Sequence, residues 1–322
     1  MLNRERAGTK GRKVGGMTIM LALVMLLAAC GGNNGAGEEA DDARKLTDAM
    51  GNEVAIPAEP QRVIASYLED HLVALGVKPA AQWSVPNGIQ DYLQEGEGGL
   101  EGVPTISYNL PPEEVASFEP DLILIGSESS VQNDLYSQYS KIAPTYVLGD
   151  EVNADWRAAL SKIGEVLGKD KEAKLALDAY EQKVKATKEK LGDTVNGKSA
   201  AILWLTQKQF YIVDNTVASG AVVYGDLGIN PPNLVNEIPE EARASWNPIS
   251  LEKLAELDAD YIFLVNSDTG QTAETMDTGL WKSIPAVKAG EVYEMDTKSS
   301  WLYSGSVAGT RVLDDVAAAL GK

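Results

Sequence analysis

The chain has 322 residues, 44% of them hydrophobic, and its 28 Lys and Arg stand against 47 Asp and Glu, for a formal net charge of −19. Because an excess of acidic side chains repels phosphate, this charge argues against nucleic acid as a partner. One cysteine excludes disulfides within the chain, and one histidine excludes metal sites built from several imidazoles, such as those for zinc or manganese.

Residues 1–29 have the pattern of an export signal. Five basic residues lie within the first thirteen positions, and uncharged, mostly apolar residues run from Met17 to Ala29. This stretch is shorter than the roughly 20 residues that a membrane-spanning helix needs, and it ends in Leu27-Ala28-Ala29-Cys30. The ending resembles bacterial lipoprotein signals, in which the thiol is acylated, with palmitate as the expected lipid. The alternative is an ordinary secretory signal with an unrelated cysteine.

If that resemblance holds, residues 1–29 are removed and Cys30 anchors the protein at the extracellular face of a Gram-positive-type cell membrane. Residues 31–43 are rich in Gly, Asn, Glu and Asp and have no large apolar side chain, so they cannot bury enough surface to order themselves. We expect residues 30–44 to be a flexible tether. The remaining 23 Lys and Arg against 46 Asp and Glu favour a soluble protein beside an anionic membrane.

The rest of the chain alternates short apolar runs with helical patterns, which is typical of an α/β fold. Four runs are predicted as buried strands, and they are Arg62 to Ser66, Asp121 to Gly126, Ala200 to Leu205 and Asp260 to Val265. Glu69 to Leu75 and Leu251 to Leu257 are predicted as helices.

An internal repeat indicates two related lobes. The segment from Glu113 to Ile123 recurs in similar form from Glu252 to Ile262, and each copy predicts a short helix followed by a buried strand. A repeat period this long excludes a solenoid. Between the copies, Lys171 to Leu191 is the strongest helical pattern of the chain and ends at Gly192. We therefore expect a lobe over 45–155, a helical linker over 156–192 and a second lobe over 193–322.

Several motifs together resemble the substrate-binding lipoproteins of iron-siderophore ABC transporters, in the class III periplasmic-binding-protein family. They are Pro60-Gln61-Arg62-Val63-Ile64-Ala65, the helix-strand repeat, Trp246-Asn247-Pro248-Ile249-Ser250-Leu251-Glu252, and the segment from Trp281 to Gly290. The resemblance implies two Rossmann-like α/β lobes joined by one long α-helix, with a ligand cleft between them. It also implies a monomer that captures a ferric siderophore and delivers it to an ABC permease dimer.

In that family one glutamate on each lobe meets arginines of the permease, and the matching positions are Glu113 and Glu252. Two carboxylates on a two-lobed body can report its orientation to a dimeric partner. The alternative is helix capping, because both glutamates begin predicted helices, where the helix dipole favours acids. Ser250 is the expected N-cap before Glu252.

In α/β lobes ligands bind at the carboxyl ends of the strands, and aromatic residues cluster at the predicted strand ends and turns. We expect eight residues to contact ligand, and they are Tyr67, Trp83, Tyr108, Trp204, Arg243, Trp246, Trp301 and Tyr303. Each aromatic has core packing as its alternative, most strongly Trp204 inside an apolar run. Arg243 would clamp an oxygen-rich ligand or merely balance Glu240 and Glu241.

Few basic residues are available near these positions, which favours a nearly neutral ferric hydroxamate or a mixed citrate-hydroxamate complex. Ferric citrate, cobalamin and haem remain alternatives in the same transport role. The siderophore's oxygens would hold the iron, so we expect no protein metal ligand and no cofactor. His71 is expected to be a helix residue packed near the lobe surface.

An enzyme is disfavoured, because the chain has no Gly-x-Ser-x-Gly elbow, no phosphate-binding Gly-rich loop and only one imidazole. A lipoprotein scaffold or adhesin is the remaining alternative outside transport. Such a protein would not need an aromatic-lined cleft between matched lobes.

Overall fold

The structure, a computed structural model, describes residues 43–321 except 87, 97, 240–241 and 269–274. These residues belong to one compact unit, Ala40–Lys322. The predicted signal, Cys30 and most of the predicted tether lie outside the described residues. Arg44, expected to be the last tether residue, instead begins β1 (Arg44–Thr47), and its guanidinium donates to the carbonyls of Glu165 and Val166 at 2.7 and 2.6 Å. No helix among the described residues is long and apolar enough to cross a membrane.

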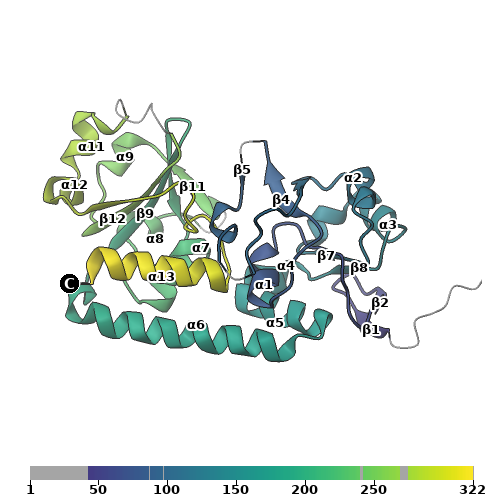
Figure 1. The fold of residues 1–322 in the computed structure, drawn as a ribbon. Helices are drawn as coiled ribbons and strands as arrows, with labels where there is room; N and C mark the ends of the chain where they lie inside the picture. The colour runs from purple at the N-terminus through teal and green to yellow at the C-terminus, as the bar shows by residue number, and fades with distance from the viewer. Residues whose placement is uncertain (1–42, 87, 97, 240–241, 269–274, 322) are drawn as a thin grey trace, which may run out of the picture. The chain divides into compact units, whose positions relative to one another are not determined.

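The first lobe contains three small sheets (Figure 1). The parallel sheet has the order β3-β7-β8 and follows from apolar runs that are buried on both faces. A second sheet has the order β5-β4-β6, and β1 pairs with β2 in an antiparallel ribbon. The strands are β2 (Glu53–Ile56), β3 (Val63–Ile64), β4 (Gln82–Val85), β5 (Gly88–Ile89), β6 (Thr105–Ser107), β7 (Leu122–Ile125) and β8 (Thr145–Val147).

The second lobe is built on one five-stranded sheet with the order β11-β10-β9-β12-β13. β9 and β12, the two longest runs of buried residues in this sheet, lie side by side in parallel. β10 and β11 extend the sheet in antiparallel pairing. The strands are β9 (Ala200–Thr206), β10 (Gln209–Val213), β11 (Trp246–Ile249), β12 (Tyr261–Asn266) and β13 (Val292–Met295). The α/β fold class is thereby confirmed, and each predicted strand overlaps an observed one, although β9 and β12 extend one residue beyond the predicted ends.

The first-lobe helices are short, apart from α5 at the boundary. They are α1 (Glu69–Ala74), η1 (Asp91–Leu93), α2 (Pro112–Ser117), η2 (Glu128–Val131), α3 (Leu135–Tyr139), α4 (Asp150–Ala154) and α5 (Trp156–Leu167). After the long α6 come η3 (Gly192–Val195), α7 (Ala218–Gly220), the π-helix η4 (Ala221–Asp226), α8 (Asn233–Asn236), α9 (Leu251–Leu254), α11 (Gly279–Ser283), α12 (Pro285–Ala289) and α13 (Ser306–Leu320).

The long helix α6 (Asp170–Leu191) matches the strongest helical pattern of the sequence. Acidic residues begin it and lysines end it, as the helix dipole favours, and Gly192 stops it with φ +50. Its apolar stripe, which includes Tyr180, Val184 and Leu191, is buried. α6 packs against α5 and α13 (Figure 1). The predicted domain boundaries at 155 and 192 remain a prediction.

The helix-strand repeat is present in both lobes. α2 leads into β7, and α9 leads into β12, as the two similar segments predicted. The loops that follow β3 and β6 carry Tyr67 and Tyr108, and Trp83 lies on β4 beside them. These loops form the wall of a cavity.

Candidate functional site

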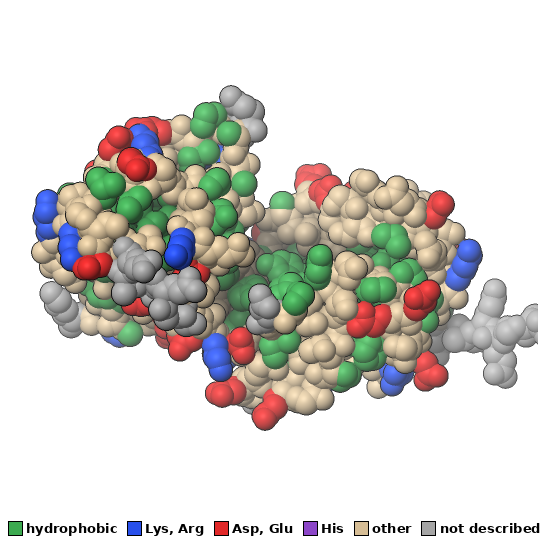
Figure 2. Space-filling view, turned by 90° about the horizontal axis from the view of Figure 1, so that it is seen from above, with side chains coloured by type: hydrophobic (Ala, Val, Ile, Leu, Met, Phe, Trp, Pro, Cys, Tyr) green, Lys and Arg blue, Asp and Glu red, His purple; other side chains and the backbone are tan. Residues whose placement is uncertain are grey.

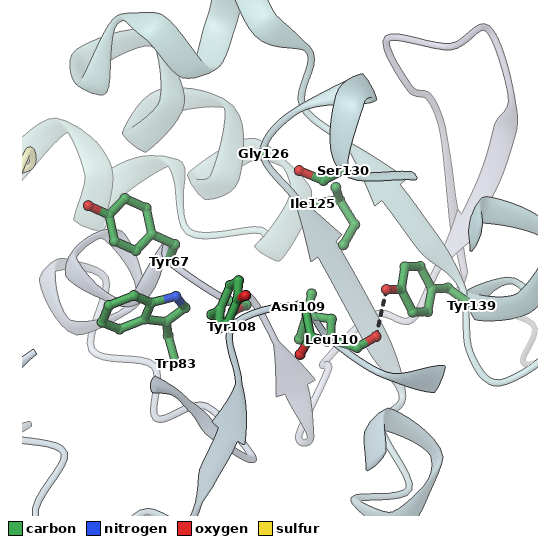
Figure 3. A pocket seen from close by; sticks show the side chains of 10 residues that line it. Tyr67, Trp83, Tyr108, Asn109, Leu110, Ile125, Gly126, Ser130 and Tyr139 are labelled. Atoms are coloured by element: carbon green, nitrogen blue, oxygen red, sulfur yellow. Dashed lines mark hydrogen bonds between the residues drawn. The ribbon is translucent and has the colours of Figure 1, made fainter. Parts of the chain in front are cut away.

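A cavity of about 230 Å³ lies at the carboxyl ends of the first-lobe strands (Figure 3). Its lining comes from the segments after β3 and β6, from β4, and from the end of β7, and it includes Ser66, Tyr67, Trp83, Tyr108, Asn109 and Gly126. The rings of Tyr67 and Trp83 lie 5.2 Å apart. The three aromatic residues predicted for this lobe are therefore brought together, as expected for strand ends that meet at one edge.

A second cavity, of about 510 Å³, is lined by residues of both lobes. Its first-lobe wall includes Tyr67, Leu68, His71, Gln90 and Trp156, and its second-lobe wall includes Thr216, Val217, Ser245, Trp246, Leu302, Tyr303 and Ser304. The ring of Tyr303 lies 6.2 Å from that of Tyr67. Tyr67 lines both cavities, so the two form one continuous candidate site.

Two aromatic side chains of this site are exposed. Tyr67 is 54% exposed and Tyr108 is 60% exposed, although large apolar rings are usually covered. Figure 2 shows one face of the molecule, on which hydrophobic side chains gather around the hollow in the middle. Tyr67 also has φ +64, a left-handed conformation that is costly for an aromatic residue and that concentrates at functional sites.

The lining of the two cavities carries no charge at neutral pH, since burial keeps its one titratable imidazole, that of His71, neutral. Among the described residues that line them, none is Lys, Arg, Asp or Glu. The polar groups are hydroxyls, amides and one imidazole, as in Ser66, Gln90 and Thr216. This site can bind by stacking and by neutral hydrogen bonds.

Directly behind the cavity wall, α1 begins with three buried titratable residues. Glu69 Oε1 accepts from the Trp83 amide at 2.6 Å, and so holds the β4 wall in place. Asp70 accepts from Tyr92 at 3.0 Å and from the amides of Val307 and Ala308, at 3.1 and 2.8 Å, at the start of α13. Asp70 thus connects the first lobe to the last helix of the second.

Burial sets the ionisation of these three residues, because it penalises the charged form. It raises the pKa of Glu69 to about 7 and that of Asp70 to about 6, and it lowers the pKa of His71 to about 4. His71 is only 6% exposed and faces the second cavity. Its expected location on a helix is confirmed, and it packs at the side of the lobe that borders this cavity.

Glu69→Gln is expected to flatten the pH dependence of stability. The folded protein holds the Glu69 proton up to about pH 7 and the unfolded chain only up to about 4.5, so this residue lowers the free energy of unfolding as pH rises between those values. Urea unfolding measures the free energy of unfolding at pH 5 and at pH 7.5. Between these two values it should fall by on the order of 2 kcal/mol more in the wild-type protein than in the variant. The exposed Glu101→Gln variant is the control, and an equal decrease in Glu69→Gln and wild type would contradict the prediction.

Comparison with known proteins decides the family. Residues 67–298, more than half of the chain, match the family described as "Periplasmic binding protein". The chain is a member of this family. The family assignment made from the sequence motifs is thereby confirmed.

Relatives and a solved structure cover nearly the whole of this binding protein. A probable siderophore-binding lipoprotein, YfiY, of Bacillus subtilis is 27% identical over 92% of this chain and 95% of its own. The iron(3+)-hydroxamate-binding protein FhuD of the same organism is 28% identical over 88% and 90%. The crystal structure of a FhuD fold-family component of a Fep/Fec-like ferrichrome ABC transporter from Bacillus subtilis matches with a TM-score of 0.72 and 25% identity, over 86% of this chain and 100% of that one.

Two predicted site residues lie in the core or behind the cavity of this binding protein. Trp301 is fully buried, stacks on Phe263 with centroids 4.8 Å apart, and donates through Nε1 to Asp315 at 2.8 Å. The prediction that Trp301 contacts ligand was therefore wrong, because its ring is closed into the core. Trp204 is partly buried and meets Trp246 edge-on at 5.8 Å, so it supports a cavity residue from behind.

Arg243 lies beside the second cavity and is held by acceptors of its own lobe. Its Nε is 3.3 Å from Oδ2 of the buried Asp214, which also accepts from the Thr216 amide at 3.0 Å. Glu240 and Glu241, the expected alternative partners, lie outside the described residues. Arg243 is not among the residues that line either cavity. Its described role is to fix the loop that carries Thr216.

The two predicted docking glutamates are on the surface. Glu113 on α2 and Glu252 on α9 are exposed, and neither carboxylate has a hydrogen bond or ion pair within the described part of the chain. Glu114, which could have replaced Glu113, instead accepts from the Ser107 amide at 3.2 Å. Ser250 is the N-cap of α9, as predicted, and accepts from the Lys253 amide.

Sequence patterns did not identify Trp156 and Gln90 as cavity residues. Trp156 begins α5, and its ring is covered on the other side by the Arg157 guanidinium at 4.4 Å. An aromatic residue at the start of an amphipathic helix was a usable signal for Trp156. Gln90 follows a two-residue strand, and no local pattern marks it.

Proposed function

We propose that this protein captures a ferric siderophore of the hydroxamate or citrate-hydroxamate type and delivers it to an ABC permease for iron uptake. The observation that best supports this proposal is the uncharged, aromatic lining of the two connected cavities. A ferric trishydroxamate is a nearly neutral, bulky complex, and aromatic walls complement it better than they complement a highly charged one. The names of the relatives, which include siderophore-binding and iron(3+)-hydroxamate-binding proteins, support this ligand class.

Capture needs no chemical step in this proposal. Tyr67, Trp83 and Tyr108 contact the complex from the first lobe, and Trp246 and Tyr303 contact it from the second. The siderophore's own oxygens hold the iron. Loaded protein then docks on the permease dimer through Glu113 and Glu252, and an acylated Cys30 keeps it at the extracellular face of the membrane.

The test is a titration panel followed by tryptophan fluorescence. Ferrichrome, ferric desferrioxamine and ferric citrate are added to the purified protein lacking residues 1–29, with cobalamin and haem as the competing ligands. We expect quenching by the ferric hydroxamates, because Trp83 and Trp246 line the cavities. Quenching by cobalamin or haem alone would overturn the ligand assignment and leave the transport role, and no quenching by any of them would favour a scaffold.

Tyr67→Ala should weaken binding of the best ligand about tenfold, because it removes the ring shared by both cavities. The matched control is Leu175→Ala on α6, which truncates another large exposed apolar side chain that lines neither cavity. Isothermal titration calorimetry measures both. An unchanged dissociation constant in Tyr67→Ala would contradict the placement of the ligand.

A further inference from the structure

Two polar side chains of the second cavity have a buried atom without a hydrogen-bond partner. The imidazole Nδ1 of His71 and the amide Oε1 of Gln90 are both inaccessible and unbonded among the described residues. His71 is 6% and Gln90 4% exposed, and both line the cavity. They come from separate segments, since His71 belongs to α1 and Gln90 lies between β5 and η1.

Such atoms are rare because leaving one unbonded costs the folded protein its desolvation free energy. Two comparable buried side chains of the same lobe, which line neither cavity, are bonded. Thr145, also buried, donates to the Ala143 carbonyl at 3.0 Å, and Gln82 uses its amide to donate to the carbonyls of Leu100 and Val103. Ser66, which lines the first cavity, has the same kind of unbonded atom. Of the seven such atoms among the described residues, three therefore belong to residues that line the cavities.

The chemistry of these groups defines what they would bind. Burial keeps the His71 imidazole neutral at neutral pH, so it offers one donor and one acceptor. The Gln90 amide oxygen is an acceptor. With no Lys, Arg, Asp or Glu among the lining residues, the pair suits an uncharged group rather than an ion.

We propose that His71 and Gln90 form a polar subsite that binds an uncharged, hydrogen-bond-donating group of the ligand's organic frame, either an amide N–H or a hydroxyl. The inference rests on the proposed function, because it assigns one wall of the same cavity. It makes these two residues determinants of specificity for the siderophore's frame, while the aromatic residues contact the complex as a whole.

The test compares affinity with the stability of the ligand-free protein in His71→Leu and Gln90→Met. If these atoms bind the ligand, each variant raises the dissociation constant for ferrichrome about tenfold. The melting temperature of the ligand-free variant stays equal to that of wild type or rises, because an unbonded buried polar group has been removed. Thr145→Val is the control, because it deletes a satisfied buried hydrogen bond away from the cavity. It should lower the melting temperature and leave the dissociation constant unchanged.

A second ligand distinguishes recognition of the siderophore's organic frame from a general effect of the substitutions on the cavity. Ferric tris(N-methylacetohydroxamate) has the same iron coordination as ferrichrome but no N–H or O–H group, so both variants should bind it as wild type does. Equal losses for the two complexes, or an unchanged ferrichrome constant in both variants, would overturn the subsite. If His71→Leu does not fold, Gln90→Met alone decides. Wild-type protein that binds neither complex would instead count against the hydroxamate ligand of the proposed function.

Discussion

Gly305→Ala is expected to lower the free energy of unfolding by about 3 kcal/mol, one of the largest losses available to a single methyl group in this protein. Gly305 has φ +142, and an added Cβ would overlap the Asp70 carboxylate. Asp70 would have to move away, and the hydrogen bonds from Val307 and Ala308 at the start of α13 would break. Those bonds are charge-assisted when Asp70 is ionised and lie in a buried site, where an unpaired group is most costly.

Gly290→Ala is a control for adding a side chain at a positive φ without a steric overlap. Gly290 also has a positive φ, +77, but an added Cβ there meets nothing within 4 Å. It should lose only about 1 kcal/mol, the cost of placing a side chain in that conformation. Urea unfolding measures both variants, and equal losses would mean that Asp70 does not restrict position 305.

A double-mutant cycle isolates the contact itself. In an Asp70→Ala background the carboxylate is gone, so Gly305→Ala should cost less than it does in the wild-type background. Asp70→Ala alone should also destabilise the protein, because the amides of Val307 and Ala308 lose their acceptor. If the cost of Gly305→Ala is the same with and without Asp70, the loss has another cause.

The sequence predicted well those features that depend on neighbours along the chain. The run that became β12 is buried throughout, and the stripe on α6 gave that helix to within one residue of its observed start. Ser250 was identified as an N-cap because the cap bonds a residue only three positions away. Local patterns carry such information because strand and helix periodicity acts over a few residues.

Features that depend on residues far apart in the sequence could not be predicted from local patterns. Trp301 is in a polar-looking segment, yet it is closed into the core by Phe263 and by Asp315 of α13. Asp70 accepts from amides more than 230 positions away, and no local pattern marks that contact. Such contacts decide which side of a turn faces a cavity. For this reason five of the eight residues predicted to contact ligand line the cavities, and three do not.

The docking proposal rests on two exposed carboxylates in equivalent places of a repeated unit. Glu113 is the second residue of α2, which precedes β7, and Glu252 is the second residue of α9, which precedes β12. A helix-capping role alone would not require exposure without a partner, and at α9 the capping bond is already made by Ser250. Carboxylates that remain unpaired on the surface are available to arginines of a permease.

Reversing both charges, in Glu113→Lys with Glu252→Lys, is expected to reduce uptake of a ferric chelate to background while its dissociation constant stays within twofold of wild type. Lysines at both positions would face the permease arginines with like charge, and like charges across an interface cost several kcal/mol. Uptake of radioactive iron is measured in cells whose only copy of the binding protein is the variant, and binding is measured on the purified protein.

The control must have the same net charge, because a less acidic protein would also approach an anionic membrane differently. Glu101→Lys with Glu189→Lys provides it, since both residues are exposed and neither lies on α2 or α9. Loss of uptake in both double variants would indicate a general charge effect, and normal uptake in the Glu113 and Glu252 double variant would reject docking through these residues. Loss in that variant alone, with ligand binding intact, would separate delivery from capture and place delivery on the repeated helix-strand unit of each lobe.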